Sequence, residues 1–445
     1  MFENQKILVL GFARSGYEVA KVLIARHNEV IVTDLKNDDK EKEAELVSLG
    51  VKVVITDKQE DLLDESFDYV VKNPGIRLDN PTVVKAASLN IPVINELEVA
   101  YNLLPKNVKI IGITGSNGKT TTTTMTYEVL KNAGLPVHLG GNIGIPMSGL
   151  LKDVKENDYL VLEISGHQMH DFVDFKVDIA VMTNLSVVHV DHFGTYENYK
   201  YNKCLIFRHQ TESDLAILNL ENEDVLEGSR DIPSSKLYFS SVKKADSYLK
   251  DNKIYYKDEE IIDTTNCIVK GNHNAENMMC AILVAKHLGV SNEIIKETLE
   301  NFKGVEHRIE YVANINERTF YNDSKSTNVK STQIALSAFQ KPTIILLGGL
   351  DRNLPFDDLK DYMSNVKAVV CYGETKHKIA DFVNSINIDC YIKDTLRESV
   401  HKAYELSNEG DVILLSPACA SWDQYKSFEE RGCEFKQIVL EELTK

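Results

Sequence analysis

The chain is 445 residues long, and its 43% hydrophobic and 26% charged residues lie in the ordinary globular range, which excludes a disordered or collagen-like polymer. Its formal net charge of −17 argues against a general affinity for nucleic acid or an anionic membrane surface, because both need a basic face. The seven cysteines are scattered and include no CxxC pair, so the sequence indicates neither a disulfide framework nor a zinc site and favours a reducing cytosol.

The N-terminal region has the pattern of a β-α-β unit. A strand is predicted at residues 7–10, followed by a glycine-containing turn, a helix, and a strand that ends at Asp34. The first apolar run is too short for a secretory signal, and no apolar stretch is long enough to cross a bilayer, so we expect a cytoplasmic protein. The turn "GFARSG" is a weak form of the dinucleotide fingerprint, because Ala13 replaces its middle glycine, and it leaves NAD binding open.

A second apolar strand, residues 108–114, leads directly into "GSNGKTT" at 115–121 and then into a helix. The glycines of this loop allow the backbone to fold closely around phosphate, and Lys119 adds a point charge. At the helix start, Thr120 or Thr121 can cap a backbone N–H group or bind magnesium. A glycine-rich turn with a solvated lysine is the alternative, but the strand, loop and helix in this order favour a phosphate loop.

Polar residues that could act beside this loop follow in the middle of the chain. The strand within 155–165 ends in Glu163, which would lie at the carboxyl edge of a parallel sheet, where a metal neutralises phosphate charge. A solvated strand-end acid is the alternative. The motif His189-x-Asp-His is weak evidence for a metal cluster by itself, since solvated or capping roles are more common. Taken alone, Lys203 would be an ordinary exposed helix lysine.

Three further features complete the middle of the chain. Asn274 and Asn277 are three residues apart on a predicted helix and share a face, so their amides could bond an adenine edge, although capping is the commoner use of Asn. Residues 236–263 predict a hairpin that turns at Asp251–Asn252. The glycine-rich turn at 140–146 could be purely structural.

The C-terminal part, from about residue 306, again alternates strands and helices. Strands are predicted within 318–324, 341–351, 366–374 and 409–419. Such alternation predicts parallel, doubly wound sheets. At roughly 150 residues per domain, the length corresponds to about three domains. We place their boundaries at 1–106, 107–304 and 305–445, and expect an α/β fold throughout.

Several motifs resemble those of the Mur ligases. "TGSNGKT" (114–120) resembles the nucleotide loop of Mur ligases and folylpolyglutamate synthases, and "EISGHQM" (163–169) resembles a second motif, from which Gly166 and His167 depart. The run from Asn184 to Lys203 and the C-terminal "SPACASWDQY" followed by "FEERG" resemble two more. The last is characteristic of the family members that add D-glutamate to UDP-N-acetylmuramoyl-L-alanine. The resemblance covers the whole chain.

This resemblance implies a three-domain α/β fold with a Rossmann-like UDP-binding domain at 1–106, a central phosphate-loop ATP-binding domain at 107–304 and a Rossmann-like domain for D-glutamate and ATP at 305–445. The central domain would bind ATP with two Mg²⁺ ions. The implied ATP-binding residues are Gly115, Ser116, Asn117, Gly118, Lys119, Thr120, Thr121, Asn274, Asn277, Arg308 and Asp323. The implied metal ligands are Thr120, Glu163, His189 and Lys203, the last as a carbamate, and Lys119 acts with them in catalysis. Asn184–Leu185 would be the strand before the histidine.

The same resemblance assigns the two other substrates. Residues implied for the UDP substrate are Ala13, Arg14, Ser15, Asp34, Asn73, Gly75, Asn142, Ser165 and Gln168. Residues implied for D-glutamate are Lys325, Thr327, Arg352, Ser421 and Phe428. Trp422, the only tryptophan, is expected to serve in packing.

The expected activity is ATP-dependent amide ligation through an acyl phosphate, in the cytoplasmic synthesis of peptidoglycan precursors, and hence in cell-wall biogenesis, cell shape and division. The expected partners are small-molecule substrates, without nucleic acid or membrane insertion, and the chain is expected to act as a monomer. Another Mur-type or folylpolyglutamate-type ligase would share the ATP-binding residues but lack the C-terminal motif. A nicotinamide-dependent dehydrogenase built on residues 1–100 would leave the phosphate loop unused, and a nucleotide switch would hydrolyse ATP whether or not D-glutamate is present.

Overall fold

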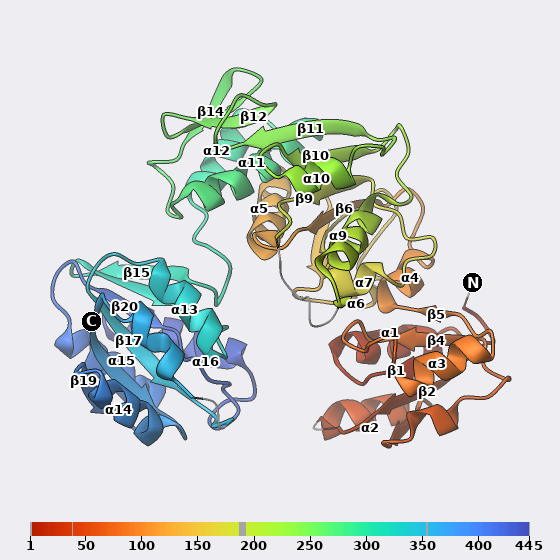
Figure 1. The fold of residues 1–445 in the computed structure, drawn as a ribbon, viewed down its shortest axis with the longest axis horizontal. Helices are drawn as coiled ribbons and strands as arrows, with labels where there is room; N and C mark the ends of the chain where they lie inside the picture. Colours follow the sequence, from red (N-terminus) through yellow and green to blue (C-terminus); the bar gives the residue numbers. More distant parts are fainter. Residues whose placement is uncertain (1, 38, 187–192, 353–354, 445) are drawn as a thin grey trace. The chain divides into compact units, whose positions relative to one another are not determined.

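The structure is a computed structural model that describes residues 2–37, 39–186, 193–352 and 355–444. The chain folds into two compact units, Met1–Asn301 and Phe302–Lys445. In the part of the chain that the structure describes, the strands form three sheets, of five, nine and six strands. Helices alternate with the strands along the chain (Figure 1), as predicted for an α/β fold. None of the helices in these ranges is both long and apolar enough to span a membrane.

The first sheet has the strand order β3-β2-β1-β4-β5, and all its pairs are parallel. The strands are β1 (Lys6–Leu10), β2 (Glu29–Asp34), β3 (Lys52–Ile55), β4 (Tyr69–Lys72) and β5 (Val93–Ile94). The helices of this region are α1 (Arg14–Ile24), α2 (Lys40–Ser48), α3 (Pro81–Ser88) and α4 (Glu96–Tyr101). The predicted β-α-β unit is confirmed, and its first strand is completely buried from Ile7 to Leu10 because helices pack on both faces of a parallel sheet.

The second sheet has the order β14-β13-β12-β11-β10-β9-β6-β8-β7. Its strands are β6 (Lys109–Thr114), β7 (Val137–Gly141), β8 (Tyr159–Glu163), β9 (Ile179–Met182), β10 (Leu215–Asn219), β11 (Ser235–Ser240), β12 (Ser247–Lys250), β13 (Lys253–Tyr256) and β14 (Glu259–Asp263). The associated helices are α5 (Lys119–Asn132), α6 (Met147–Leu150), α7 (Gly166–Met169), α9 (Tyr196–Cys204), α10 (Glu223–Gly228), α11 (Asn272–His287) and α12 (Asn292–Glu300).

Pairing in the second sheet is parallel from β7 to β12 and antiparallel from β12 to β14. The predicted hairpin turn is confirmed, because Asp251 and Asn252 join the antiparallel strands β12 and β13 with positive φ values of 52° and 61°. The strand implied at Asn184–Leu185 is wrong, since β9 ends at Met182. The backbone and side chain of Asn184 instead bind the phosphate-loop segment.

The third sheet, in the second unit, has the order β15-β16-β20-β17-β18-β19, and only its β15–β16 pair among the described strands is antiparallel. Its strands are β15 (Glu310–Ile315), β16 (Arg318–Asn322), β17 (Thr343–Gly348), β18 (Val366–Tyr372), β19 (Asp389–Ile392) and β20 (Val412–Leu415). Its helices are α13 (Val329–Ser337), α14 (Lys376–Ser385), α15 (Leu396–Leu406) and α16 (Phe428–Gln437). The four predicted strands are confirmed as β16, β17, β18 and β20.

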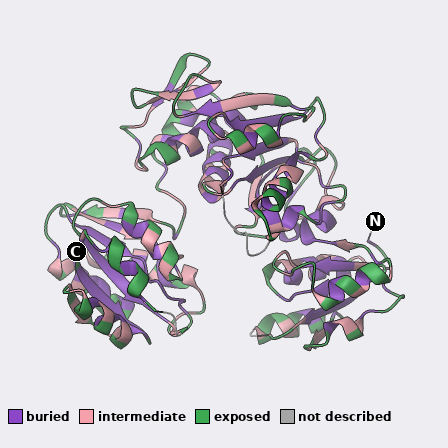
Figure 2. Cartoon of the chain, viewed as in Figure 1, coloured by how far each residue is buried: buried purple, intermediate pink, exposed green. Residues whose placement is uncertain are grey.

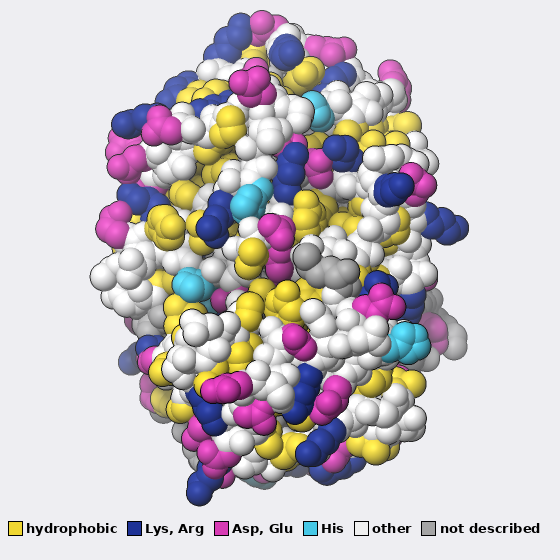
Figure 3. All heavy atoms as spheres, turned by 90° about the vertical axis from the view of Figure 1, so that its right-hand side faces the viewer, with side chains coloured by type: hydrophobic (Ala, Val, Ile, Leu, Met, Phe, Trp, Pro, Cys, Tyr) yellow, Lys and Arg dark blue, Asp and Glu magenta, His cyan; other side chains and the backbone are white. Residues whose placement is uncertain are grey.

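Burial follows the layered architecture. Figure 2 shows many of the strands as buried and the outer faces of many helices as exposed, whereas strands such as β11 are only partly buried. On the face drawn in Figure 3, basic and acidic side chains are interspersed and do not form one basic patch. This surface agrees with the acidic composition, since a nucleic-acid-binding face would gather Lys and Arg.

Candidate active site

The loop of residues 115–118 joins β6 to α5 and has a backbone that only glycine tolerates at two positions. Gly115 and Gly118 have φ values of +145° and +79°. A Cβ atom on Gly115 would lie 2.0 Å from Thr183 Oγ1, and one on Gly118 would lie 2.5 Å from Asn277 Oδ1. Both glycines therefore combine an unusual backbone conformation with close packing against a neighbouring segment.

Asn184 holds the first half of this loop in place. Its backbone oxygen accepts from Ser116 N at 2.8 Å, and its Oδ1 accepts from Asn117 N at 3.0 Å. Donors for an anion would therefore come from the first turn of α5, whose N–H groups have no partner four residues earlier. Thr120 and Thr121 lie in this turn. The helix dipole adds positive potential at the same point.

Two lysines meet beside the loop. Lys119 Nζ donates to the backbone oxygens of Gly115 and Ser116, both at 2.9 Å. Lys203 Nζ donates to the same Gly115 oxygen at 3.1 Å and to Thr114 Oγ1 at 3.0 Å. The structure thus brings together Lys119 from the start of α5 and Lys203 from the end of α9, which are far apart in the sequence.

Lys203 is not the exposed helix lysine that its sequence context alone suggests, because only 2% of it is exposed. Burial lowers its pKa well below the ordinary value for lysine, and the nearby positive charge of Lys119 lowers it further, while Glu163 has a weaker opposite effect. A buried amine with a depressed pKa spends more time neutral than a surface lysine does. The neutral form is the one that reacts as a nucleophile.

Glu163, at the carboxyl end of β8, joins the loop to a neighbouring turn. Its Oε2 accepts from Thr120 Oγ1 at 2.6 Å, and its Oε1 accepts from Asn142 Nδ2 at 2.7 Å. The carboxylate is 2% exposed, so it is a buried acid and not a solvated strand end. His189, which sequence resemblance places with these ligands, lies outside the described residues.

A cavity of about 320 Å³ lies between the loop after β1 and the turns of the central sheet. Except for Asp34, every residue predicted for the UDP substrate lines it: Ala13, Arg14, Ser15, Asn73, Gly75, Asn142, Ser165 and Gln168. Arg14 Nη1 donates to the Gly144 oxygen at 2.8 Å, which ties the two regions together. His167 lines the cavity too, although it departs from the family motif.

Hydrogen bonds made by residues of this set support the cavity walls. Asp34 accepts from Phe12 N at 2.6 Å and so braces the loop after β1 from outside the lining. Asn73 Nδ2 donates to Ser15 Oγ at 3.1 Å. Ser165 and Gln168 form a reciprocal capping box on α7, with Ser165 N donating to Gln168 Oε1 at 2.8 Å.

The second unit contains the residues predicted for the ribose and for a phosphate. Asp323 is 2% exposed and follows β16; its Oδ2 accepts from Ser416 Oγ at 2.7 Å and its Oδ1 from Ile309 N at 3.2 Å. Burial raises its pKa to about 6, although these hydrogen bonds and Arg308 oppose the shift. Arg308 itself is exposed.

Four of the five residues predicted for D-glutamate lie on loops that follow strands of the third sheet, and the fifth, Phe428, is the first residue of α16. Lys325 Nζ lies 5.8 Å from the centroid of the Phe428 ring, and Thr327 is half-buried. Ser421 is 2% exposed, and its Oγ has no hydrogen-bond partner within the described residues. The packing role expected for Trp422 is wrong, because the ring is 64% exposed and the Arg352 guanidinium lies 5.0 Å from its centroid.

Two residues that sequence analysis did not single out support the predicted sites. Arg431 is fully buried and donates to Ser324 Oγ, at 2.9 Å, and to the Cys419 oxygen, so it joins the two loops that carry Lys325 and Ser421. Tyr199 Oη lies 2.9 Å from Ser116 Oγ. Tyr199 precedes Lys203 by one helical turn, a spacing that places both on one face of α9 and could have identified it.

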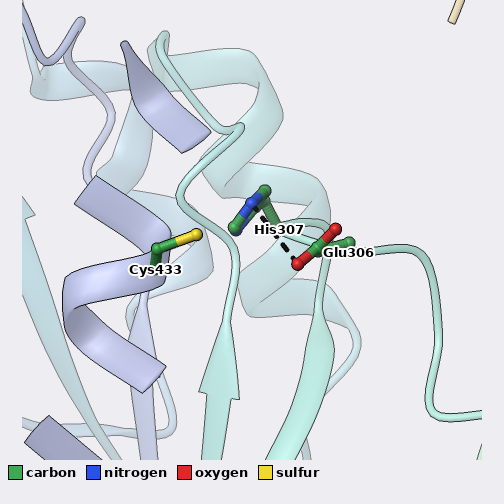
Figure 4. A group of neighbouring side chains, drawn as sticks. All are labelled: Glu306, His307 and Cys433. Atoms are coloured by element: carbon green, nitrogen blue, oxygen red, sulfur yellow. Dashed lines mark ion pairs between the residues drawn. The ribbon is translucent and has the colours of Figure 1, made fainter. Parts of the chain in front are cut away.

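Glu306, His307 and Cys433 place three possible metal ligands within 4.8 Å of one another (Figure 4). The hydrogen bonds of His307 argue against a metal there. Asn322 Nδ2 contacts His307 Nδ1 at 2.9 Å and also donates to Glu310 Oε2 at 2.9 Å, while Asn322 Oδ1 accepts from Ser324 N. The amide orientation makes Nδ1 an acceptor, so Nε2 of the neutral ring carries the proton and has no lone pair for a metal.

Comparisons with known proteins match one and the same family in successive parts of the chain. Family models match at residues 5–95 (Mur ligase MurD-like, N-terminal domain), 113–285 (Mur ligase middle domain) and 307–419 (Mur ligase, glutamate ligase domain). UDP-N-acetylmuramoylalanine–D-glutamate ligases of Bacillus cereus (strain G9842) and Bacillus anthracis are each 45% identical to this chain over 442 residues, covering 98% of both sequences.

Solved structures share the fold at lower identity. The UDP-N-acetylmuramate-alanine ligase MurC of Thermotoga maritima has a TM-score of 0.60 at 20% identity, covering 98% of this chain and 100% of its own. The MurF ligase of the same organism, in complex with ADP, has a TM-score of 0.56 at 17% identity, covering 98% and 95%. With the near-complete coverage of the bacillar relatives, these findings show that the chain belongs to the Mur ligase family.

Proposed function

We propose that the chain is an ATP-dependent ligase that joins D-glutamate to UDP-N-acetylmuramoyl-L-alanine. The name shared by relatives at 45% identity supports this substrate pair. The main support for the reaction class is that Lys119 and Lys203 both donate to the Gly115 oxygen, beside the buried carboxylate of Glu163. Such a set suits the transfer of a highly charged phosphoryl group.

In the proposed reaction, an oxygen of the alanyl carboxylate attacks the γ-phosphorus of ATP, and ADP leaves. The acyl phosphate is then attacked at its carbonyl carbon by the amine of D-glutamate. The C–N bond forms, the amine loses a proton, and inorganic phosphate departs with the former carboxylate oxygen. Lys119 and the first turn of α5 would hold the phosphates and stabilise the charge that develops during both transfers.

The residues beside the loop fit magnesium. Mg²⁺ prefers hard oxygen ligands, and the Thr120 hydroxyl and Glu163 carboxylate, 2.6 Å apart, supply them. A carbamate on Lys203 would add an anionic oxygen, and the buried, low-pKa amine suits its formation. We propose Thr120, Glu163, His189 and carbamylated Lys203 as ligands of two Mg²⁺ ions, which would neutralise phosphate charge when bound.

The UDP substrate and D-glutamate would bind where the residues predicted for each of them lie. We propose that the cavity lined by Arg14, Asn73 and Asn142 binds the UDP substrate, within a domain of residues 1–106 and the adjoining central domain of residues 107–304. For D-glutamate we propose Lys325, Thr327, Arg352, Ser421 and Phe428, in a domain of residues 305–445. The orphaned Ser421 hydroxyl fits a carboxylate ligand, because a buried polar atom without a partner is costly unless a ligand satisfies it.

ATP would also contact residues outside the loop. We propose Asn274 and Asn277 for adenine, Asp323 for the ribose and Arg308 for a phosphate. The cellular role would be the synthesis of peptidoglycan precursors in the cytoplasm by a monomeric enzyme, and hence cell-wall growth and division.

The test is phosphate release from ATP in the presence of Mg²⁺, UDP-N-acetylmuramoyl-L-alanine and a panel of D- and L-amino acids. Release that depends on D-glutamate supports the proposal, and equal release with another amino acid would favour a different Mur-type ligase. Lys119→Ala should lower turnover on the order of a hundredfold to a thousandfold. Lys131→Ala, at the far end of the same helix, is the matched control and should retain activity.

A further inference from the structure

Two cysteines lie together in the third sheet, and neither has a part in the proposed ligation. Cys371 is on β18 and Cys390 is on the neighbouring strand β19, and their Sγ atoms are 3.1 Å apart. Both are free thiols in the structure. We propose that the pair is a redox modification site, at which a peroxide forms a reversible disulfide that weakens D-glutamate binding. The effect on D-glutamate rests on the proposed function, whereas the formation of the disulfide does not.

The register of the two strands puts both thiols on one face of the sheet. β18 and β19 are parallel, and Cys390 pairs with Val369, two residues before Cys371. Because side chains alternate along a strand, Cys371 and Cys390 are diagonal neighbours on the same face. Cys371 belongs to the hydrophobic core there, and Cys390 packs against it. A sulfur–sulfur bond of about 2 Å therefore needs a shift of only about 1 Å.

The two thiols differ in exposure, which gives them different roles. Cys371 is fully buried, whereas Cys390 is half-buried on β19, the edge strand of this sheet among the described strands. A peroxide from solvent therefore meets Cys390 first. A hydrogen bond from Cys371 lowers the pKa of Cys390, although burial opposes the shift, and the same contact raises the pKa of Cys371. A partly accessible thiol with a lowered pKa beside a second thiol is typical of redox-sensing cysteines.

The oxidation takes two steps. The Cys390 thiolate attacks one oxygen of hydrogen peroxide, the O–O bond breaks, and a sulfenic acid forms on Cys390. The hydroxide that leaves takes up the proton that Cys390 released. The Cys371 sulfur then attacks the sulfenic sulfur, the S–O bond breaks, and the departing hydroxide takes the Cys371 proton. Two thiols and one peroxide thus give one disulfide and two water molecules, and a dithiol reductant reverses the change.

A shift of β19 reaches a loop that carries a residue proposed for D-glutamate. β18 is held between β17 and β19, whereas β19 pairs with β18 alone among the described strands, so β19 moves more readily. Just beyond the end of β19, the Asp394 backbone oxygen accepts from Gln424 Nε2 at 2.8 Å. Gln424 N in turn donates to the Ser421 oxygen at 3.1 Å. The disulfide therefore displaces the loop of Ser421 through Asp394 and Gln424.

Peptide mass spectrometry tests whether the bond forms. Native protein treated with hydrogen peroxide, alkylated and digested should yield peptides joined through Cys371 and Cys390, and dithiothreitol should separate them. In Cys371→Ala, oxidation of Cys390 should stop at the sulfenic acid, which dimedone traps. In Cys390→Ala, Cys371 should gain neither a partner nor dimedone. Native protein without the joined peptides would overturn the proposal, and trapping at Cys371 instead of Cys390 would overturn the assigned roles.

Kinetics on the same samples test the effect on D-glutamate. In the oxidised native enzyme the KM for D-glutamate should rise about fivefold or more, the range typical of coupling between separate sites, and dithiothreitol should restore it. Cys390→Ala should keep the native KM before and after peroxide. Cys433→Ala removes an exposed thiol on α16 and is the matched control, which should respond to peroxide as the native enzyme does. An equal rise in Cys390→Ala would show that oxidation elsewhere is responsible.

Gln424→Leu tests the route from β19 to the loop. The variant lacks the hydrogen bond to Asp394, so it should form the disulfide as the native protein does but show a smaller rise in KM. A disulfide that leaves the native KM unchanged would contradict the effect on D-glutamate. Native protein that forms the disulfide but no amide would contradict the proposed function and leave the modification site intact. Native protein that ligates D-glutamate but forms no disulfide would contradict the modification site alone.

Discussion

The Gly115 carbonyl accepts hydrogen bonds from both Lys119 and Lys203, and this shared contact is the main electrostatic feature of the site. Two ammonium groups on one oxygen repel each other, so the more deeply buried amine gives up its proton more readily. This agrees with the strongly lowered pKa of Lys203. A neutral amine in this position can react with carbon dioxide, which a solvated, protonated lysine resists.

Lys203→Ala should therefore reduce turnover on the order of a hundredfold, because it removes a charge-stabilising group from the site. Added formate or acetate should restore part of the activity by replacing the missing oxygen donor. The native protein should also give a carbamate signal in ¹³C NMR with labelled bicarbonate. Lys200→Ala is the control, since Lys200 lies on the same helix but pairs with Glu227 at the surface. Neither rescue nor a carbamate signal would contradict the assignment.

Because burial raises the pKa of Asp323, we expect ATP binding to depend on pH. A carboxylate accepts hydrogen bonds from ribose hydroxyls best when ionised, and burial raises the pKa of Asp323 from 3.8 to about 6. The KM for ATP should therefore rise as the pH falls through about 6. In Asp323→Asn the KM should be higher throughout and lose this inflection. An identical inflection in the variant would assign it to another group.

For single residues, the sequence predicted which residues form the candidate site better than it predicted their burial and contacts. Lys119, Glu163 and Lys203 were identified by motif, and the structure brings them together. The burial of Lys203, the exposure of Trp422 and the supporting role of Arg431 depend on segments more than 80 residues away or on tertiary packing. Residue type and local spacing do not contain that information.

Among the secondary-structure elements, α4 and α6 meet around an acid that the proposed chemistry does not use. Glu96, at the first position of α4, is 4% exposed and accepts a hydrogen bond from Ser148 N in α6. Burial raises its pKa from 4.5 to about 7. The folded state therefore holds this proton more tightly than the unfolded chain. The stability that this contributes is complete below pH 4.5 and is lost as the pH rises through about 7.

Glu96→Gln should stabilise the protein at pH 8 and have little effect at pH 4.5, because the amide keeps an acceptor for Ser148 N without a buried charge. The shift from 4.5 to about 7 corresponds to at most about 3 kcal/mol at pH 8. Thermal melting of both proteins at the two pH values measures it. Equal melting temperatures at pH 8 would show that Glu96 does not carry this charge penalty.

The elements were predicted well where a continuous apolar run marks a buried parallel strand, as in β6, β8, β17 and β20. The edge strands β15 and β19 were missed. β19 is short and only half-buried at Cys390 and Tyr391, so its apolar pattern is weak. The end of β9 was misplaced because Asn184 serves the phosphate loop, a long-range demand that no local pattern reveals.

On the scale of the whole molecule, alternating strands and helices correctly predicted parallel-rich α/β sheets. The matches of three family models to successive stretches, and of relatives along 98% of the chain, agree with that organisation. A net charge of −17 adds a requirement to the proposed function, since anionic substrates must be held by local cations, for which we propose Lys119 and Arg308, against a repulsive overall field.

Isotope labelling is the most direct test of whether ATP activates the alanyl carboxylate as an acyl phosphate. UDP-N-acetylmuramoyl-L-alanine labelled with ¹⁸O in both alanyl carboxylate oxygens is converted with ATP, Mg²⁺ and D-glutamate, and the released phosphate is examined by mass spectrometry. An acyl phosphate predicts one ¹⁸O atom in each phosphate and one in each new amide. Unlabelled phosphate, released together with the amide product, would contradict activation of the carboxylate by ATP.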